Sequence, residues 1–185
     1  MNNDTNNNDF DKITDFFYNI TLNYLNILDK HFSMSGYETL LLKRGKDVGA
    51  DTLVVNFGDE SNPMVFSFTF IPIAAEEMGL DTVLLQVYAV LPSKPQMNTM
   101  SVLEKSLNFI NNQLPVGFLS INNNNEIILR TVQAVSTNSY DLETNIFDKI
   151  AELFQITISI YNPHIDDICR GKKTFKQLAF ELSNY

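Results

Sequence analysis

The stretch LPVGFLSINNNNEIILRTVQAV, residues 114–135, places four consecutive asparagines between two apolar runs. Residues 116–121 and 126–135 are rich in apolar and β-branched side chains, which are typical of strands. Asparagine tolerates a positive φ and its side chain closes local turns, so we expect residues 122–125 to be a connector. Two apolar runs joined by such a short polar loop predict a β-hairpin. The asparagine run is therefore interpreted as turn structure, because amides alone make no strong ligand site.

The segment before this hairpin predicts three or four strands. Residues 64–71, MVFSFTFI, alternate with a period of two, which is typical of a half-buried strand. Residues 51–57 are rich in Val and Leu, and residues 37–43 are expected to add a short extended piece. Residues 81–91, DTVLLQVYAVL, are apolar on both faces, so we expect this strand at the centre of the sheet or at an interface.

Helices are predicted before, between and after these strands. The first runs from about residue 10 to His31, on an apolar face with steps of three and four: Phe10, Ile13, Phe17, Ile20, Tyr24 and Ile27. The second begins at a capping-box pattern, Ser101 to Glu104, and carries Leu103, Leu107, Ile110 and Leu114. A third is expected over 141–161 and should end at Asn162-Pro163. Short helices are expected over 164–170 and 174–182, the latter burying Phe175, Leu178 and Leu182.

This order of elements predicts an α+β fold with an antiparallel sheet, because helices and strands are segregated rather than alternating. The 185 residues fit one domain. We expect residues 1–9, which are polar and asparagine-rich, to be a disordered tail, and residues 10–185 to form a single domain.

Composition restricts the class of partner. The net charge of −9 and the pI of about 4.6 disfavour binding to nucleic acid, since the chain repels phosphate backbones. The one basic cluster, formed by Arg170, Lys172, Lys173 and Lys176, is interpreted as a solvated helix end. No apolar run approaches the length of a membrane span, and the N-terminus lacks the pattern of a signal peptide. A single cysteine, Cys169, suits a reducing cytoplasm.

The sequence contains no convincing catalytic or metal-binding pattern. The phosphate-binding glycine loops and the nucleophile elbow are absent. His31 and His164 have no partner histidine at ligand spacing, and acidic residues at a helix start explain Asp166 and Asp167. Cys169 with His164 could imitate a thiol and its base, but nothing supplies an orienting group, and a structural thiol is the simpler interpretation. The adjacent Glu76 and Glu77 are interpreted as a solvated turn. We expect no cofactor, no metal and no enzymatic activity.

The C-terminal part of the chain resembles the YbjN-like family, which has the fold of the class I type III secretion chaperones. The resemblance rests on Leu107, Phe109 and Asn111 late in a helix, then on Leu114-Pro115-Val116-Gly117 before a strand. It continues through Ile128-Leu129-Arg130 in the hairpin, Tyr161-x-Pro163 late in a helix, and Gly171. It implies an antiparallel sheet in the order α-β-β-β-α-β-β-α, with the piece at 37–43 as one extra strand. It also implies a homodimer that binds other polypeptides.

The predicted function is accordingly a non-catalytic, cytoplasmic protein-interaction domain, chaperone-like or regulatory, that binds a partner polypeptide as a homodimer. The alternatives are a small ligand-binding protein or enzyme with an unrecognised pocket, or a structural subunit of an assembly. The contact is expected on the strand 81–91, whose role as core, dimer interface or binding patch is left open. Its candidate protein-binding residues are Val83, Leu85, Val87, Tyr88 and Val90.

Overall fold

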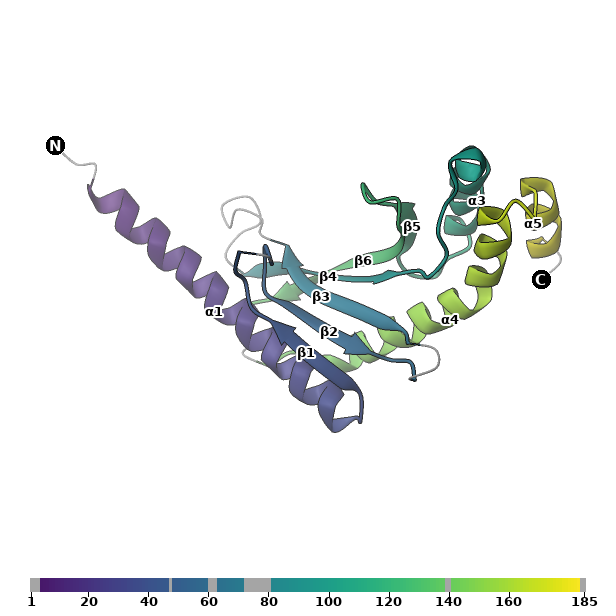
Figure 1. Cartoon of the computed structure of the whole chain (residues 1–185). Helices are drawn as coiled ribbons and strands as arrows, with labels where there is room; N and C mark the ends of the chain where they lie inside the picture. The colour runs from purple at the N-terminus through teal and green to yellow at the C-terminus, as the bar shows by residue number, and fades with distance from the viewer. Residues whose placement is uncertain (1–3, 47, 60–62, 72–80, 139–140, 184–185) are drawn as a thin grey trace. The chain divides into compact units, whose positions relative to one another are not determined.

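The computed structural model describes the backbone of residues 4–46, 48–59, 63–71, 81–138 and 141–183, and side chains from Phe17 onward. The chain forms an α+β fold with a six-stranded antiparallel sheet, as predicted (Figure 1). The helices are α1 (Asp4–Met34), η1 (Met97–Thr99), α3 (Met100–Asn111), α4 (Thr144–Cys169) and α5 (Phe175–Leu182). The strands are β1 (Glu38–Leu42), β2 (Thr52–Asn56), β3 (Val65–Ile71), β4 (Thr82–Val90), β5 (Phe118–Ile121) and β6 (Ile127–Ser136).

The strand order is β1-β2-β3-β4-β6-β5, so β1 and β5 are the edges and β4 lies centrally, as its two apolar faces predicted. The extra strand expected at 37–43 is confirmed as β1. The helix α1 begins at Asp4, within the segment 1–9 that was expected to be a tail, and residues 1–3 lie outside the described residues.

The chain divides into two compact units. Unit 1 consists of Met1–Asn56, Ser67–Gln86 and Val132–Thr144, and unit 2 consists of Phe57–Phe66, Val87–Thr131 and Asn145–Tyr185. A single domain over 10–185 stays a prediction, and the units are treated separately below.

In unit 1, one side of α1 packs on the aromatic face of β3. The ring centroids of Phe32 and Phe68 lie 5.3 Å apart, and those of Tyr24 and Phe70 lie 6.1 Å apart. Phe68 and Phe70 alternate with half-buried Ser67 and Thr69, which confirms the predicted period of two. The hydroxyl of Tyr24 also donates to the backbone carbonyl of Ser136, at 2.7 Å. This hydrogen bond joins the largely apolar face of α1 to the end of β6.

In unit 2, the predicted hairpin is present as β5 and β6, which pair from Phe118 opposite Arg130 to Ile121 opposite Ile127. The Asn122 side-chain oxygen accepts from the backbone N–H groups of Asn124 and Glu126, each at 2.9 Å. Asn125 has a φ of 58°, the left-handed conformation that asparagine tolerates. The asparagine run is therefore a connector, as predicted.

The predicted start of the second helix is wrong. The N-cap of α3 is Thr99, without a capping hydrogen bond, and Ser101 lies inside the helix with an exposed side chain. The Thr99 hydroxyl lies 3.0 Å from the carbonyl oxygen of Gln96 and 3.3 Å from that of Cys169. It therefore donates toward these carbonyls instead of accepting from an N–H group of the first turn. Leu114 lies beyond the end of α3 at Asn111. A true capping box occurs instead at Thr174 and Gln177, at the start of α5.

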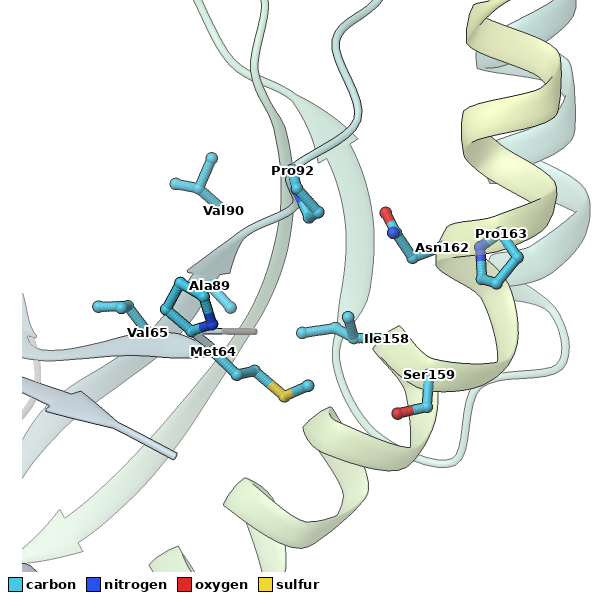
Figure 2. Close-up of a pocket in the computed structure, with 10 residues that line it drawn as sticks. Met64, Val65, Ala89, Val90, Pro92, Ile158, Ser159, Asn162 and Pro163 are labelled. Atoms are coloured by element: carbon cyan, nitrogen blue, oxygen red, sulfur yellow. The ribbon is translucent and has the colours of Figure 1, made fainter. Parts of the chain in front are cut away.

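The predicted end of the third helix is also wrong, because α4 continues through Pro163 to Cys169 and absorbs the short helix expected at 164–170. A proline inside a helix costs about 3 kcal/mol, through one lost hydrogen bond and a steric clash. Beyond Pro163 the helix buries Ile165 and Ile168, and burying two such side chains contributes roughly 3–6 kcal/mol. The tertiary packing thus offsets the local cost. Figure 2 shows the helix changing direction near Asn162 and Pro163, as expected for a proline kink.

Candidate functional site

The strand 81–91, which carries the predicted binding residues, is buried in its middle and exposed at its end. Leu85 and Val87 are fully buried, while Val83 and Tyr88 are half-buried. Val90, the last residue of β4, is 44% exposed. Leu85 and Val87 therefore serve as packing residues in this fold, and protein binding by this strand as a whole stays a prediction.

Val90 lies beside a pocket of about 330 Å³ in unit 2 (Figure 2). Three segments that are distant in sequence form it: the approach to β3, the end of β4, and α4 around the proline kink. We call this the β4–α4 pocket, and its lining residues are Pro63, Met64, Val65, Ala89, Val90, Pro92, Ile158, Ser159, Asn162 and Pro163. None of these ten described residues carries a charged side chain.

Two polar groups accompany the apolar lining. The Asn162 side-chain oxygen accepts from the hydroxyl of the buried Ser93, at 3.0 Å, which fixes the orientation of the carboxamide and leaves its N–H₂ group for another acceptor. Ser159, which also lines the pocket, adds a hydroxyl that can donate or accept a hydrogen bond. The pocket thus combines these two polar side chains with apolar side chains from the strands and from α4.

The rim of the pocket includes two apolar residues. Val65, the first residue of β3, is 45% exposed, and Val90 is exposed to the same extent. Figure 2 shows Ile158 and Asn162 on the α4 side and Met64, Val65 and Ala89 on the strand side. Chemically, such a pocket can hold an apolar group and hydrogen-bond a neighbouring polar atom through Asn162 or Ser159. The ten described lining residues include no acid, no base and no thiol.

The sequence does not predict the α4 side of this pocket. Asn162-Pro163 predicts a helix end, whereas both residues lie inside α4. The available signal was the apolar periodicity, which continues past Pro163 to Ile165 and Ile168. The hydrogen bond between Ser93 and Asn162 joins residues 69 positions apart and has no local signature.

The His164 ring lies among charged side chains of α5 and of the segment before it. The Nδ1 atom of His164 lies 2.8 Å from Nζ of Lys173 and 3.3 Å from a carboxylate oxygen of Glu181 on α5. Burial lowers the pKa of His164, and the nearby Lys173 ammonium lowers it further, against the opposing carboxylates of Glu181 and Asp167. Lys173 also donates to Glu181 at 2.7 Å. These contacts join α5 to the end of α4, so they are structural.

Cys169 is 1% exposed, and burial raises the pKa of its thiol to about 11. Because the thiolate is the reactive form, this cysteine is a poor nucleophile at neutral pH. Of the basic cluster, Arg170 pairs with Asp166 at 2.8 Å, and Lys173 is held by Glu181. The described residues contain no group of three or more His, Cys, Asp or Glu side chains that could hold a metal ion. Glu76 and Glu77 lie outside the described residues.

A second surface feature of unit 2 lies on the hairpin, away from the sequence-based candidates. The guanidinium carbon of Arg130 is 5.5 Å from the ring centroid of Phe118, which is 42% exposed and lies opposite it in the hairpin register. The Nε atom of Arg130 is buried and has no hydrogen-bond partner among the described residues. The contact holds the exposed ring of Phe118, on the edge strand β5, beside the Arg130 cation on β6.

Comparisons with known proteins give a structural likeness but no sequence match. No family model matches the sequence, and no curated protein matches it. Among solved structures it is similar to YbjN, a candidate transcription regulator from E. coli, with 16% identity and a TM-score of 0.42. The match covers 76% of this chain and 92% of YbjN. At this identity and TM-score the likeness carries no functional conclusion, and membership of the YbjN-like family stays a prediction. No helix in the described part of the chain is both long and apolar enough to cross a membrane.

Proposed function

We propose that this chain is a non-catalytic, cytoplasmic protein-interaction domain, chaperone-like or regulatory, whose β4–α4 pocket receives an apolar segment of a partner polypeptide. The observation that carries the proposal is the chemistry of the pocket. Its lining is uncharged and combines apolar side chains with the oriented carboxamide of Asn162 and the hydroxyl of Ser159.

The size of the pocket favours side chains over a large ligand. At about 330 Å³ it lies at the lower end of the range for small-molecule sites, roughly 300–1,000 Å³. A polypeptide can fill such a pocket with one or two apolar side chains while the rest of the segment lies across the rim. Val65 and Val90, both partly exposed, provide apolar surface for that flanking contact.

The two polar groups fit a polypeptide backbone, because every peptide unit presents one donor and one acceptor. A partner carbonyl can accept from the Asn162 carboxamide, whose orientation the Ser93 hydroxyl maintains. A partner N–H can donate to the Ser159 hydroxyl, which also lines the pocket. An apolar side chain between these two contacts would then enter the pocket, as in the recognition of extended peptides by pockets for alternate side chains.

A second candidate is a small apolar ligand, which a pocket of this volume also accommodates. The lining contains no titratable side chain, so this alternative is a binding protein and not an acid–base enzyme. A structural subunit of an assembly remains the third interpretation, and such a protein would use the same pocket for a permanent contact.

To test the proposal, displayed random dodecapeptides are selected on the immobilised full-length chain. The selected peptides are then synthesised, and their affinity for the chain is measured by fluorescence anisotropy. We expect apolar sequences to be enriched. We also expect Val90→Asp, which places a charge on the rim, to weaken their binding at least about tenfold, that is by about 1.4 kcal/mol. The matched control is Met97→Asp, which changes a residue that is 86% exposed and does not line the pocket.

Circular dichroism verifies that both variants are folded. Binding that is equal in wild type and V90D, or selection without apolar enrichment, would refute the proposal. A panel of small apolar compounds is screened by thermal shift in parallel. Compounds that stabilise wild type but not V90D, in the absence of peptide binding, would favour the second candidate.

A further inference from the structure

Arg130 is the one charged residue in the strands β2, β3, β4, β5 and β6, whose other residues are all uncharged. Its guanidinium presents five N–H donors, and it makes no hydrogen bond or ion pair with any described residue. Within the described part of the chain, its Nε is the single buried side-chain nitrogen or oxygen without a partner, so its two Nη groups reach the surface. A cation with unused donors at the surface can receive an anion.

Two aromatic residues flank Arg130 across the strands. Phe118 lies opposite it on β5, with the ring centroid 5.5 Å from the guanidinium carbon. On the other side, the Leu91 N–H donates to the Ile127 carbonyl at 2.8 Å, which makes these two residues opposite in the β4–β6 pair. Three residues along each strand, Tyr88 therefore lies opposite Arg130. We call Phe118, Arg130 and Tyr88 the Arg130 row.

The Arg130 row faces away from the core of unit 2. The neighbours of Arg130 along β6, Leu129 and Thr131, are buried, and so is Leu119 beside Phe118. Because side chains alternate along a strand, the row points to the opposite face of the sheet. The ring of Phe118 is 42% exposed, so this face is open to another molecule.

The composition of the row favours a single carboxylate over a phosphate polymer. Nucleic acids and anionic lipid surfaces are held by several cations together, and on these strands they would meet one cation in a chain of net charge −9. One carboxylate matches one guanidinium, because its two oxygens accept parallel hydrogen bonds from the two Nη groups. The Tyr88 hydroxyl, which makes no hydrogen bond to a described residue, can donate to the same carboxylate.

An apolar pair lies two residues along from the Arg130 row. In the same register Val90 lies opposite Ile128, and both share the face of Arg130. Val90 is 44% exposed. Two residues of a strand span about 7 Å, which is also the spacing between alternate side chains of an extended peptide. An extended segment can therefore set one side chain on Val90 and a second on Arg130.

We propose that the Arg130 row binds an acidic side chain of the partner polypeptide, two positions from the apolar side chain that packs on Val90. The partner polypeptide and its contact with Val90 are those of the proposed function, on which this inference rests. The Arg130 row adds the chemistry of the partner: an Asp or Glu at alternate spacing with an apolar residue.

The selected dodecapeptides test this chemistry on the full-length chain. We expect Asp or Glu to be enriched two positions from an apolar residue, although the net charge of −9 disfavours acidic peptides in general. The tightest such peptide is compared with an analogue in which Gln or Asn replaces the acidic residue. By fluorescence anisotropy the analogue should bind wild type about three- to tenfold more weakly. This comparison needs no variant of the protein.

A protein variant then assigns the effect to Arg130. Arg130→Gln should weaken binding of the acidic peptide by the same factor and leave the affinity of its neutral analogue unchanged, because the two changes remove one interaction. The matched control is Lys176→Gln, at an exposed position of α5, which changes the net charge equally and should alter neither affinity. Circular dichroism verifies that both variants are folded.

Equal affinity of wild type for the acidic peptide and its analogue would overturn the inference, and so would an equal loss in R130Q and K176Q. Either result would show that Arg130 only adds a solvated charge to this face. Apolar enrichment that is lost in V90D would in that case still support the proposed function. Selection of no peptide at all would overturn both.

Discussion

Replacement of Gly117 by alanine should destabilise the chain through two separate effects. Gly117 has a φ of +75°, a left-handed conformation that costs other residues about 1–2 kcal/mol. An added Cβ would also lie 2.8 Å from the backbone oxygen of Arg130 and 3.2 Å from Cε1 of Phe154. Neither neighbour moves easily, because Arg130 is in the β6 ladder and Phe154 is fully buried. Such overpacking costs typically about 1–3 kcal/mol, so we expect a total of about 2–5 kcal/mol.

Two other glycines separate the conformational cost from the clash. Gly36 has a φ of +89° with no atom within 4 Å of the added Cβ, and Gly171 has a φ of +68° with only Thr99 Cγ2 at 3.8 Å. Gly36→Ala and Gly171→Ala should therefore lose only about 1–2 kcal/mol each. Because the chain contains no tryptophan, urea unfolding is followed by far-UV circular dichroism. If G117A has the same free energy of unfolding as G36A, the clash predicted with Arg130 and Phe154 does not destabilise the chain, and the reasoning is refuted.

Two further predictions concern unit 2. Asn111→Ala removes both hydrogen bonds to Leu119, so it should lower the free energy of unfolding by about 1–3 kcal/mol and speed exchange of the Leu119 amide hydrogen. The control Asn108→Ala, at an exposed position of α3, should change neither quantity. Unchanged protection of the Leu119 amide in N111A would show that Asn111 does not protect this edge strand. Because the pKa of His164 is lowered in the folded state, the unfolded chain binds its proton first, and stability should fall as the pH drops below about 6.5. His164→Gln should flatten this part of a plot of Tm against pH, and an unaltered slope would exclude the contribution of His164.

The sequence by itself determined the elements whose signals are local. The period of two in residues 64–71 predicts β3 because neighbouring side chains point to opposite faces of any strand. The asparagine run predicts the hairpin because asparagine accepts the positive φ found at Asn125 and closes the turn through Asn122. These preferences belong to a few consecutive residues and act before any tertiary contact forms.

Only the tertiary structure decided where helices continue, which strand edge is closed, and which apolar residues line the pocket. The local cost at Pro163 indicates a helix end, but the burial of Ile165 and Ile168 outweighs it. Asn111 and Asn162 have the same side chain, and its role in each case depends on the group that it meets: Leu119 across a sheet edge, or Ser93 from a distant segment. Val87 and Val90 differ in the same way, one fully buried and one exposed on the rim of the pocket. Such contacts join residues that are distant in sequence, so no local pattern encodes them.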